Sequence, residues 1–161
     1  MKLAFYIVLA AIVLALVAAQ VGLLSGQRPG DIGVRDGRLK PPSGTRNSVS
    51  SQAGLYPNHP QRTYATIDAL PLKAAGAAHS LKALEAVLQE MPGMTIVEQR
   101  PDYLYAQAQT RWLKFIDDVE FWVNPASNVI EVRSASRLGQ EDFGVNRKRV
   151  EAIRAAYLAA P

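Results

Sequence analysis

The residues that could do chemistry are concentrated in one stretch near the end of the chain. An acidic run and a run rich in arginine and serine flank a turn of Asn, Pro, Ala and Ser, and a third charged group follows. Such a set suits an ion-pair network, an anion-binding pocket, hydrolytic catalysis or metal binding. The candidate polar site comprises Asp117, Asp118, Glu120, Arg133, Ser134, Ser136, Arg137, Asp142, Asn146, Arg147 and Arg149.

The cations of this stretch need a negative partner. Arg147, Lys148 and Arg149 fall in the first turn of a predicted helix, where the macrodipole disfavours each positive charge by roughly a few tenths of a kcal/mol. An external anion would also be attracted to free N–H groups at a helix start. Three interpretations stay open: an internal ion-pair network, an anion-binding pocket and a solvated charged face. The acids available inside the chain are Asp117, Asp118, Glu120, Glu131, Asp142 and Glu151.

Nucleophilic catalysis has weaker support from the residue pattern. Ser134 and Ser136 are candidate nucleophiles, but the only histidines are His59 and His79. A Ser-His-Asp set would need one of these histidines brought to the serines. The alternative is that both serines form hydrogen bonds to Asp117 and to the backbone.

Metal binding is limited by strand geometry. Asp117, Asp118 and Glu120 are hard oxygen ligands, yet neighbouring residues of a strand point to opposite faces, so Asp117 cannot share a site with the other two. We expect no metal and no cofactor. Trp112 and Trp122 are interpreted as packing and rim residues.

Alternating apolar and polar residues predict that the acidic and basic runs form a β-hairpin. Pairing apolar side chains with apolar side chains sets Phe121 opposite Ile130 and Val119 opposite Val132. A shift of one residue would set Phe121 opposite Glu131, so we predict the first register.

This register also places the charged residues of the hairpin. It sets Asp118 opposite Arg133 on the outer face and Asp117 opposite Ser134 on the apolar face. A carboxylate on an apolar face is costly unless it is paired. We therefore expect an arginine from the segment after the hairpin to pair with Asp117.

The remaining periodicity predicts the elements that hold this hairpin. Each helix has one apolar stripe and the sheet has one apolar face, and both need a cover. We predict an α+β fold with a five-stranded, mostly antiparallel sheet and two helices on one face. The predicted order is a strand at 63–70 with Ile67 inward, a helix at 75–90, strands at 94–99 and 103–111, the hairpin, and a helix at 145–159.

The N-terminus carries a candidate transmembrane helix. Leu3 to Leu24 hold no charge, and about 22 residues at ~1.5 Å each span ~33 Å, enough to cross the hydrocarbon of a bilayer. A signal peptide has a shorter apolar region that ends in a small-x-small pattern. Val17–Ala19 imitates that pattern, but the run continues, so we favour an uncleaved anchor at 1–24 over a cleaved signal sequence.

Between the span and the folded domain, the composition changes to Gly, Pro, Ser and Asn. We predict a tether at 25–62, partly packed on a globular domain at 63–161. Lys2 favours a cytoplasmic N-terminus, whereas the basic residues just beyond the span favour the opposite orientation. We expect an inner-membrane protein that contacts the bilayer through 3–24 and has a periplasmic domain.

Composition excludes several further kinds of site and partner. The 161 residues carry a formal net charge of +4 and no cysteine. Neither disulfides nor thiolate metal sites can form. No long basic run with interleaved aromatic residues is present, so we expect no nucleic acid partner.

From Gly33 to its end, the chain resembles the family called domain of unknown function 1499. The resemblance implies a domain identity but does not indicate an activity. It rests on Gly33–Leu39, on Asn47 with Val49–Gln52, on Asp117–Phe121, on Ile130–Gly139, and on Asp142–Arg149.

One departure from the family pattern concerns cysteine. Members of the family carry two cysteines where this chain has Pro42 and Ser48. Their joint absence suggests that the pair forms a disulfide in relatives, as suits an exported domain.

We therefore expect a membrane-anchored envelope domain that binds a small anionic ligand or an envelope protein partner at the junction of hairpin and helix. The alternatives are a hydrolase-like enzyme that uses Asp117, Ser134 and Arg137 or Arg147, and a purely structural accessory protein.

Overall fold

A computed structural model describes residues 1–161. Four α-helices, one short 3-10 helix and six strands follow one another along the chain. Their bounds are α1 Lys2–Gln20, β1 Ser48–Ser50, η1 Ala53–Leu55, α2 Arg62–Ala65, β2 Leu70–Pro71, α3 Ala77–Glu90, β3 Met94–Arg100, β4 Tyr103–Gln109, β5 Ile116–Asn124, β6 Val129–Ser136 and α4 Val145–Ala159.

The strands form one antiparallel sheet in the order β1-β6-β5-β4-β3. Strands β3 to β6 are neighbours because each is joined to the next by a hairpin connection. The predicted α+β class, with a sheet of five ordered strands plus helices, is confirmed. The predicted last helix also begins and ends at the observed residues.

The predicted first strand at 63–70 is wrong. Arg62–Ala65 forms α2 instead, Thr66 makes a single bridge to Ser50, and only Leu70–Pro71 forms a strand of the sheet, β2. The reason is that β1, from the segment assigned to the tether, already occupies part of the free edge of β6. β1 pairs with Arg133–Ala135 and the N–H of Ser51 binds the carbonyl oxygen of Val132, and β2 pairs only with Val129 and Ile130.

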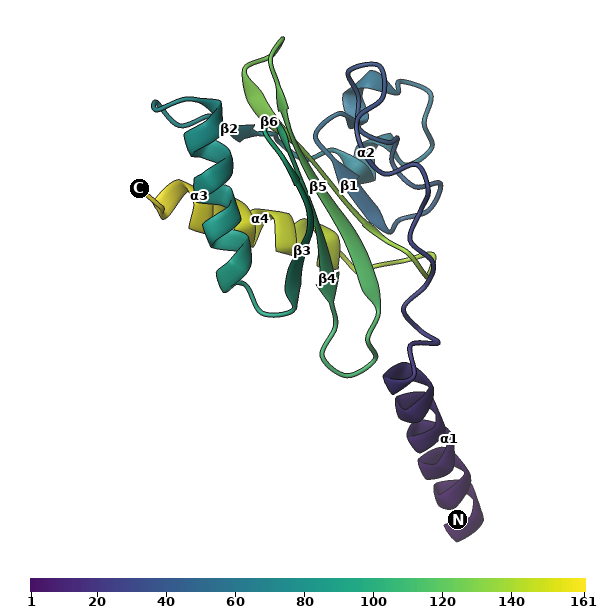
Figure 1. Cartoon of the computed structure of the whole chain (residues 1–161). Helices are drawn as coiled ribbons and strands as arrows, with labels where there is room; N and C mark the ends of the chain where they lie inside the picture. The colour runs from purple at the N-terminus through teal and green to yellow at the C-terminus, as the bar shows by residue number, and fades with distance from the viewer.

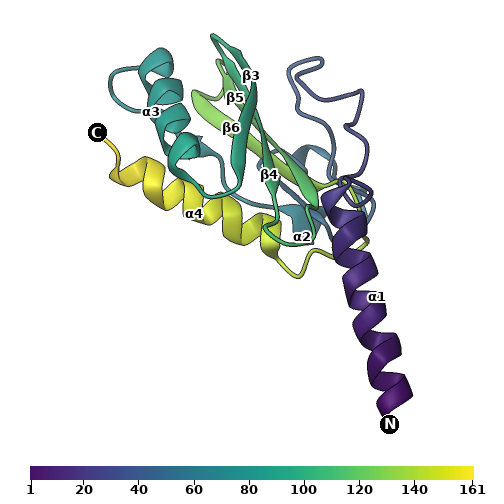
Figure 2. The ribbon, with the colours of Figure 1, turned by 60° about the horizontal axis from the view of Figure 1, so that its bottom comes forward.

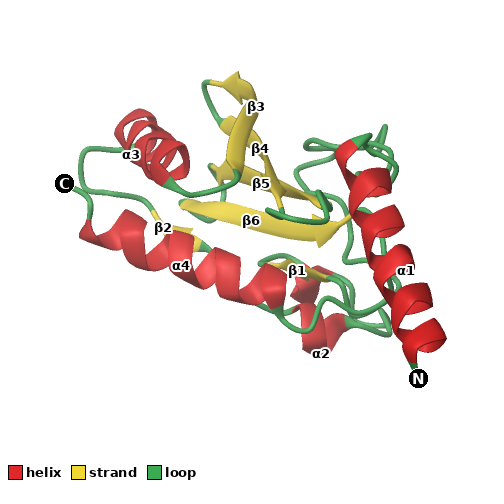
Figure 3. Ribbon diagram, turned by 90° about the horizontal axis from the view of Figure 1, so that it is seen from below, coloured by secondary structure: helices red, strands yellow, loops and turns green.

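Helices α3 and α4 cover one face of the sheet, which we call the inner face (Figures 1 and 3). Leu84 and Leu88 of α3 and Ile153 of α4 are fully buried against Val119 and Phe121 of β5. Burying each of these large apolar side chains contributes about 1.5–3 kcal/mol. This core fixes the position of α4 over β6.

The predicted hairpin register is wrong by two residues. Phe121 lies opposite Val132 and Val123 lies opposite Ile130, so each side chain stays on its predicted face but meets a different partner. The turn explains the shift, because it has four residues rather than two. Asn128 adopts a left-handed φ of 56° and donates its N–H to the Asn124 carbonyl oxygen at 2.9 Å.

The opposite, outer face of the sheet is also covered. Residues 25–47, which we call the covering segment, run across it (Figure 1). Leu39 is buried against Tyr103, Tyr105 and Trp122 in a small second core. Side chains that a two-layer fold would expose to water on this face are therefore buried.

Helix α1 leaves the domain as an extended arm (Figures 1 and 2). It has 19 residues with a mean hydropathy of 2.5, so it is long and apolar enough to cross a membrane. Only Ala19 of α1 is buried in the protein.

Candidate functional site

The hairpin distributes the predicted site residues over its two faces. Asp117 points to the inner face, and Asp118 and Glu120 point to the outer face, as strand alternation requires. Two separate polar clusters result. We call them the inner cluster, under α4, and the outer cluster, under the covering segment.

The inner cluster is centred on a buried ion pair. Arg149 of α4 donates through Nη2 to Asp117 Oδ2 at 2.5 Å. Its Nη1 donates to Ser134 Oγ at 3.1 Å and to Asn146 Oδ1 at 2.9 Å. The arginine expected for Asp117 is thus Arg149, and the pair joins β5 to α4.

Asn146 links the serines to the start of α4. Its amide oxygen accepts the Ser134 hydroxyl at 2.6 Å, and its Nδ2 donates to Ser136 Oγ at 3.0 Å. The same Nδ2 lies 2.8 Å from Asp142 Oδ2 and 3.1 Å from the carbonyl oxygen of Asn47. Both serines therefore have hydrogen-bond partners inside the protein.

Asp142 caps the first turn of α4. Its carboxylate accepts the N–H of Gly144 at 2.9 Å and the N–H of Asn146 at 3.0 Å, and it also accepts the Tyr64 hydroxyl. Burial raises the pKa of Asp142, but these hydrogen bonds outweigh burial and hold that pKa below its ordinary value. Burial and the Asp142 carboxylate raise the pKa of Tyr64 to about 12.

The cations at the start of α4 differ in their partners, and Lys148 is exposed. Arg147 donates to the carbonyl oxygens of Tyr64 at 2.6 Å and Thr66 at 2.8 Å, so its partners are backbone atoms rather than the expected carboxylate. The negative charge at this helix end comes from Asp142, whose carboxylate offsets the macrodipole.

The outer cluster begins with Arg137 and Asp118. Arg137 donates to both carboxylate oxygens of Asp118, at 2.7 Å through Nη2 and at 3.0 Å through Nε. The Tyr105 hydroxyl donates to Asp118 Oδ1 at 2.6 Å. The hydrogen bonds to Asp118 raise the pKa of Arg137, and burial raises the pKa of Tyr105.

The second pair of the outer cluster joins Arg133 to Glu120. Their closest atoms, Nη1 and Oε2, are 3.5 Å apart, and both side chains are almost fully buried. Glu120 Oε1 also accepts the Tyr103 hydroxyl at 2.8 Å and the N–H of Gly33 at 2.7 Å. Burial lowers the pKa of Arg133, but a guanidinium keeps its charge at neutral pH. This pair holds the covering segment on the sheet.

A crevice opens beside the outer cluster, between the covering segment and the end of β6. It has a volume of about 370 Å³. Arg133 Nη2 and Arg137 Nη1 form no hydrogen bond within the protein, and neither atom is sealed from solvent. We call this space the arginine crevice. The residues that line it include Gln27, Pro29, Lys40, Asp118, Arg133, Ser136 and Arg137.

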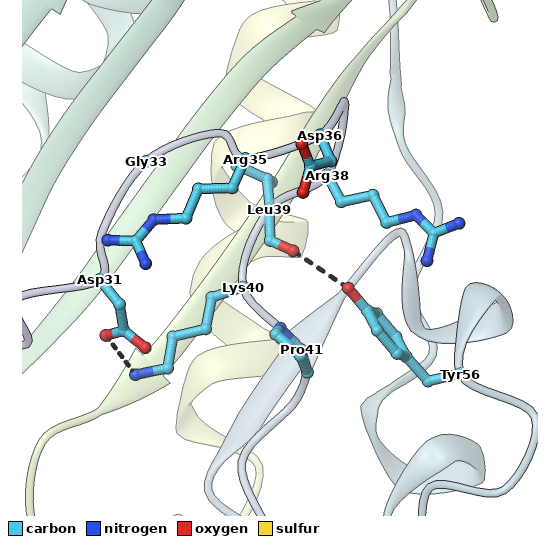
Figure 4. A pocket seen from close by; sticks show the side chains of 9 residues that line it. All are labelled: Asp31, Gly33, Arg35, Asp36, Arg38, Leu39, Lys40, Pro41 and Tyr56. Carbon is cyan, nitrogen blue, oxygen red and sulfur yellow. Dashed lines mark hydrogen bonds and ion pairs between the residues drawn. The ribbon is translucent and has the colours of Figure 1, made fainter.

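A second cavity, of about 520 Å³, lies against the turn at Asp36 and Gly37 (Figure 4). Lys40 binds Asp31 at 2.6 Å at its edge. Arg35 and Arg38 also line it, but their guanidinium groups point in opposite directions (Figure 4). They do not converge on one small ligand.

The candidate residues do not come together as a catalytic set. Ser134 is fully buried, and Arg137 lies on the opposite face of the sheet from Asp117. His59 Nδ1 accepts the N–H of Gln61, and His79 lies on α3, so neither histidine contacts the serines. Asp117 and Asp118 each bind a different arginine.

Several residues of the two clusters escaped the sequence analysis as site residues. Tyr103 and Tyr105 are the clearest, because their hydroxyls bind Glu120 and Asp118. Their spacing along β4 could have indicated this role. Strand alternation places both tyrosines on one face of the sheet, and Leu104 and Ala106 on the other. Lys40 and Gln27 carried no such signal, because only the path of the covering segment brings them to the crevice.

The comparisons with known proteins bear on identity alone. A family model described as a protein of unknown function, DUF1499, matches residues 38–157. The match includes all residues of the candidate site. Neither the curated proteins nor the solved structures gave a match to this chain.

Proposed function

We propose that this chain, which belongs to the DUF1499 family, is a membrane-anchored binding module of the cell envelope. Its ligand carries a small anionic group, a phosphate or a carboxylate, which binds in the arginine crevice. The domain faces the periplasm, and α1 remains in the inner membrane.

The observation that carries this proposal is a pair of guanidinium donors that have no acceptor within the protein. The side chains of Arg133 and Arg137 are only 4% and 5% exposed, yet each keeps one Nη group without a protein acceptor. Both Nη groups are reached by solvent, so no desolvation cost is left uncompensated in the free protein. An anionic group with oxygen acceptors would replace this water and accept charge-assisted hydrogen bonds, which are stronger than those to neutral acceptors.

The charges around the crevice favour the same class of ligand. Lys40, Arg133 and Arg137 line it, against the single carboxylate of Asp118. Although each cation also has an acidic partner, these pairs hold the guanidinium groups in fixed positions. Each guanidinium offers one free Nη group, so a phosphate or carboxylate can accept one charge-assisted hydrogen bond from each of the two arginines.

The inner cluster supports a structural role beside this site. Asp117, Ser134, Asn146 and Arg149 bind one another under α4, so their donors and acceptors are used within the fold. They hold α4 on the sheet and leave the crevice as the place for a ligand.

The proposal is tested by isothermal titration of the full chain in maltoside micelles with inorganic phosphate and with acetate. We expect saturable binding of at least one anion, weakened severalfold in Lys40→Gln and in Arg137→Lys, which loses the free Nη1 group. Arg35→Gln/Arg38→Gln, at the second cavity, is the matched control and should bind like wild type. No binding by folded wild-type protein, or loss of binding only in the control, would refute the proposal.

A second experiment distinguishes a free anion from a lipid headgroup as the ligand of the crevice. The same titration is repeated in nanodiscs made with anionic phospholipid. If headgroups fill the crevice, free phosphate binds several times more weakly there than in micelles. Equal binding in both media identifies a soluble ligand.

A further inference from the structure

The loop between β4 and β5, residues 110–115, presents an unusual set of exposed side chains. Trp112 is 66% exposed and Leu113 is 36% exposed, and Arg111 and Lys114 lie on either side of them. The Arg111 guanidinium lies 5.1 Å from the centre of the Trp112 ring. Exposed apolar side chains flanked by cations are characteristic of segments that lie in the interface of a membrane.

The position of this loop relative to α1 gives the second, independent observation. The amide Nε2 of Gln20, the last residue of α1, donates to the carbonyl oxygen of Trp112 at 3.2 Å. Figures 1 and 2 show the loop between β4 and β5 beside the domain-proximal end of α1. No other hydrogen bond links a side chain of α1 to the domain.

The length of α1 then fixes the depth of the loop. Its 19 residues, at about 1.5 Å each, span about 28 Å, close to the hydrocarbon thickness of a bilayer. If α1 crosses the membrane, Gln20 lies at the membrane surface, and Trp112 lies at the same level. Trp and Tyr are enriched at that level, and Lys and Arg there contact anionic headgroups.

We infer that the loop 110–115 is a second membrane contact, in which Trp112 and Leu113 enter the bilayer interface while Arg111 and Lys114 bind lipid phosphates. The inference rests on the retention of α1 as an anchor in the proposed function. It adds that the domain is held in one orientation on the membrane, with the β4–β5 end of the sheet toward the lipid.

The two tryptophans make this inference testable. Trp122 is 7% exposed in the outer core, so Trp122→Phe leaves Trp112 as the only indole. The full chain is reconstituted into vesicles with and without lipids that carry a spin-label quencher just below the headgroups. We expect strong quenching of Trp112 in Trp122→Phe and little quenching of Trp122 in Trp112→Phe.

A matched control places an indole elsewhere on the surface. Leu158 is 56% exposed near the C-terminal end of α4, which lies at the opposite end of the domain from α1 (Figures 1 and 3). Leu158→Trp in the background Trp112→Phe/Trp122→Phe therefore reports on a site away from α1. It should stay unquenched. Equal quenching of this indole and of Trp112, or none of Trp112, would overturn the inference. If Trp122→Phe does not fold, the quenching of wild type minus that of Trp112→Phe gives the same answer.

Flotation of the vesicles separates this inference from the proposed function. If the full chain does not float with lipid, α1 is not a membrane anchor, and the inference is refuted. Full chain that floats with Trp112 unquenched leaves the anchor intact and refutes only the second contact. Anion binding in the arginine crevice is measured in micelles and depends on neither result.

Discussion

At the level of single residues, most charges of the last hairpin form ion pairs within the fold. Asp117 binds Arg149 and Asp118 binds Arg137, each at hydrogen-bonding distance. Buried pairs of this kind contribute little net stability compared with apolar residues, but removing one partner is costly. Substitutions that break a single pair therefore show what the pair does.

The first prediction concerns Asp117→Ala. Arg149 would stay buried without its carboxylate, although its bonds to Ser134 and Asn146 remain. We expect a loss of about 3 kcal/mol in the free energy of unfolding, measured by urea denaturation. Glu151→Ala, which breaks the exposed pair with Arg154 on the same helix, should cost less than about 1 kcal/mol. Equal stability of Asp117→Ala and wild type would show that the pair does not lock α4.

The second prediction concerns Asp142 and pH. Its pKa in the folded state lies below the ordinary 3.8, so its hydrogen bonds add stability above that pH and lose it as the pH falls through the folded pKa. Asp142→Asn should therefore be less stable than wild type at pH 7, and the difference should shrink below pH 3.8. Urea denaturation between pH 2.5 and 7 measures this difference.

Asp36→Asn is the control for this series. Asp36 is exposed and has a left-handed φ of 50°, which asparagine also tolerates. Its unfolding free energy should follow that of wild type at every pH. A difference between Asp142→Asn and wild type that grows toward low pH would contradict the assigned pKa direction.

At the level of elements, the covering segment turns a two-layer fold into a three-layer one. Leu39 and the N–H of Gly33 bind the outer face, where Trp122 and Glu120 would otherwise meet water. The segment has little regular structure of its own. Its attachment therefore depends on a few contacts. One of them, from the N–H of Ser43 to Ser48 Oγ, lies at the positions where the family resemblance implies a cysteine pair.

The third prediction follows from these positions. Ser48 Oγ accepts the N–H of Ser43, the residue after Pro42, at 2.7 Å, so the side chain of residue 48 lies next to position 42. Pro42→Cys/Ser48→Cys should form a disulfide and stabilise the fold by about 2 kcal/mol under oxidising conditions. Mass spectrometry detects the bond, and thermal melts with and without dithiothreitol measure the gain. Free thiols after mild oxidation would contradict this pairing.

The sequence predicted some elements better than others. Val150, Ile153 and Tyr157 defined α4 because a single apolar stripe dominates that helix. The strand at 63–70 failed because its alternation was local, whereas the edge of β6 was assigned by β1, far away in sequence.

For the candidate site, the sequence predicted the faces and not the neighbours. Alternation placed Asp117 inward and Asp118 outward, and periodicity placed Arg149 at the start of α4. The register was wrong because the length of the turn, set by the left-handed Asn128, leaves no trace in the face pattern. The burial of Glu120 could not be predicted, since it depends on the path of the covering segment.

At the level of the whole molecule, the structure joins a domain to an apolar helix that is long enough to span a bilayer. Lys2 and the basic residues that follow α1 favour opposite orientations. The side of the membrane on which the domain lies therefore needs a direct test. The chain has no cysteine, so a single introduced thiol reports its own location.

The fourth prediction is that Asn58→Cys, in an exposed turn, reacts with a membrane-impermeant maleimide on the periplasmic side. Labelling should be complete in spheroplasts and should not increase when the inner membrane is permeabilised. The cysteine-free wild type is the control for background labelling. Labelling only after permeabilisation would place the domain in the cytoplasm and refute export.

The central claim is that Arg133 and Arg137 hold an anion while Arg149 serves the fold. The most direct test is NMR of the full chain in micelles, with ¹⁵N-labelled arginine side chains, during titration with inorganic phosphate. We predict saturable shifts of the guanidinium resonances of Arg133 and Arg137, and unmoved resonances of Arg149, Arg35 and Arg38. Shifts confined to Arg35 and Arg38, or no shift in any of the five, would contradict the claim.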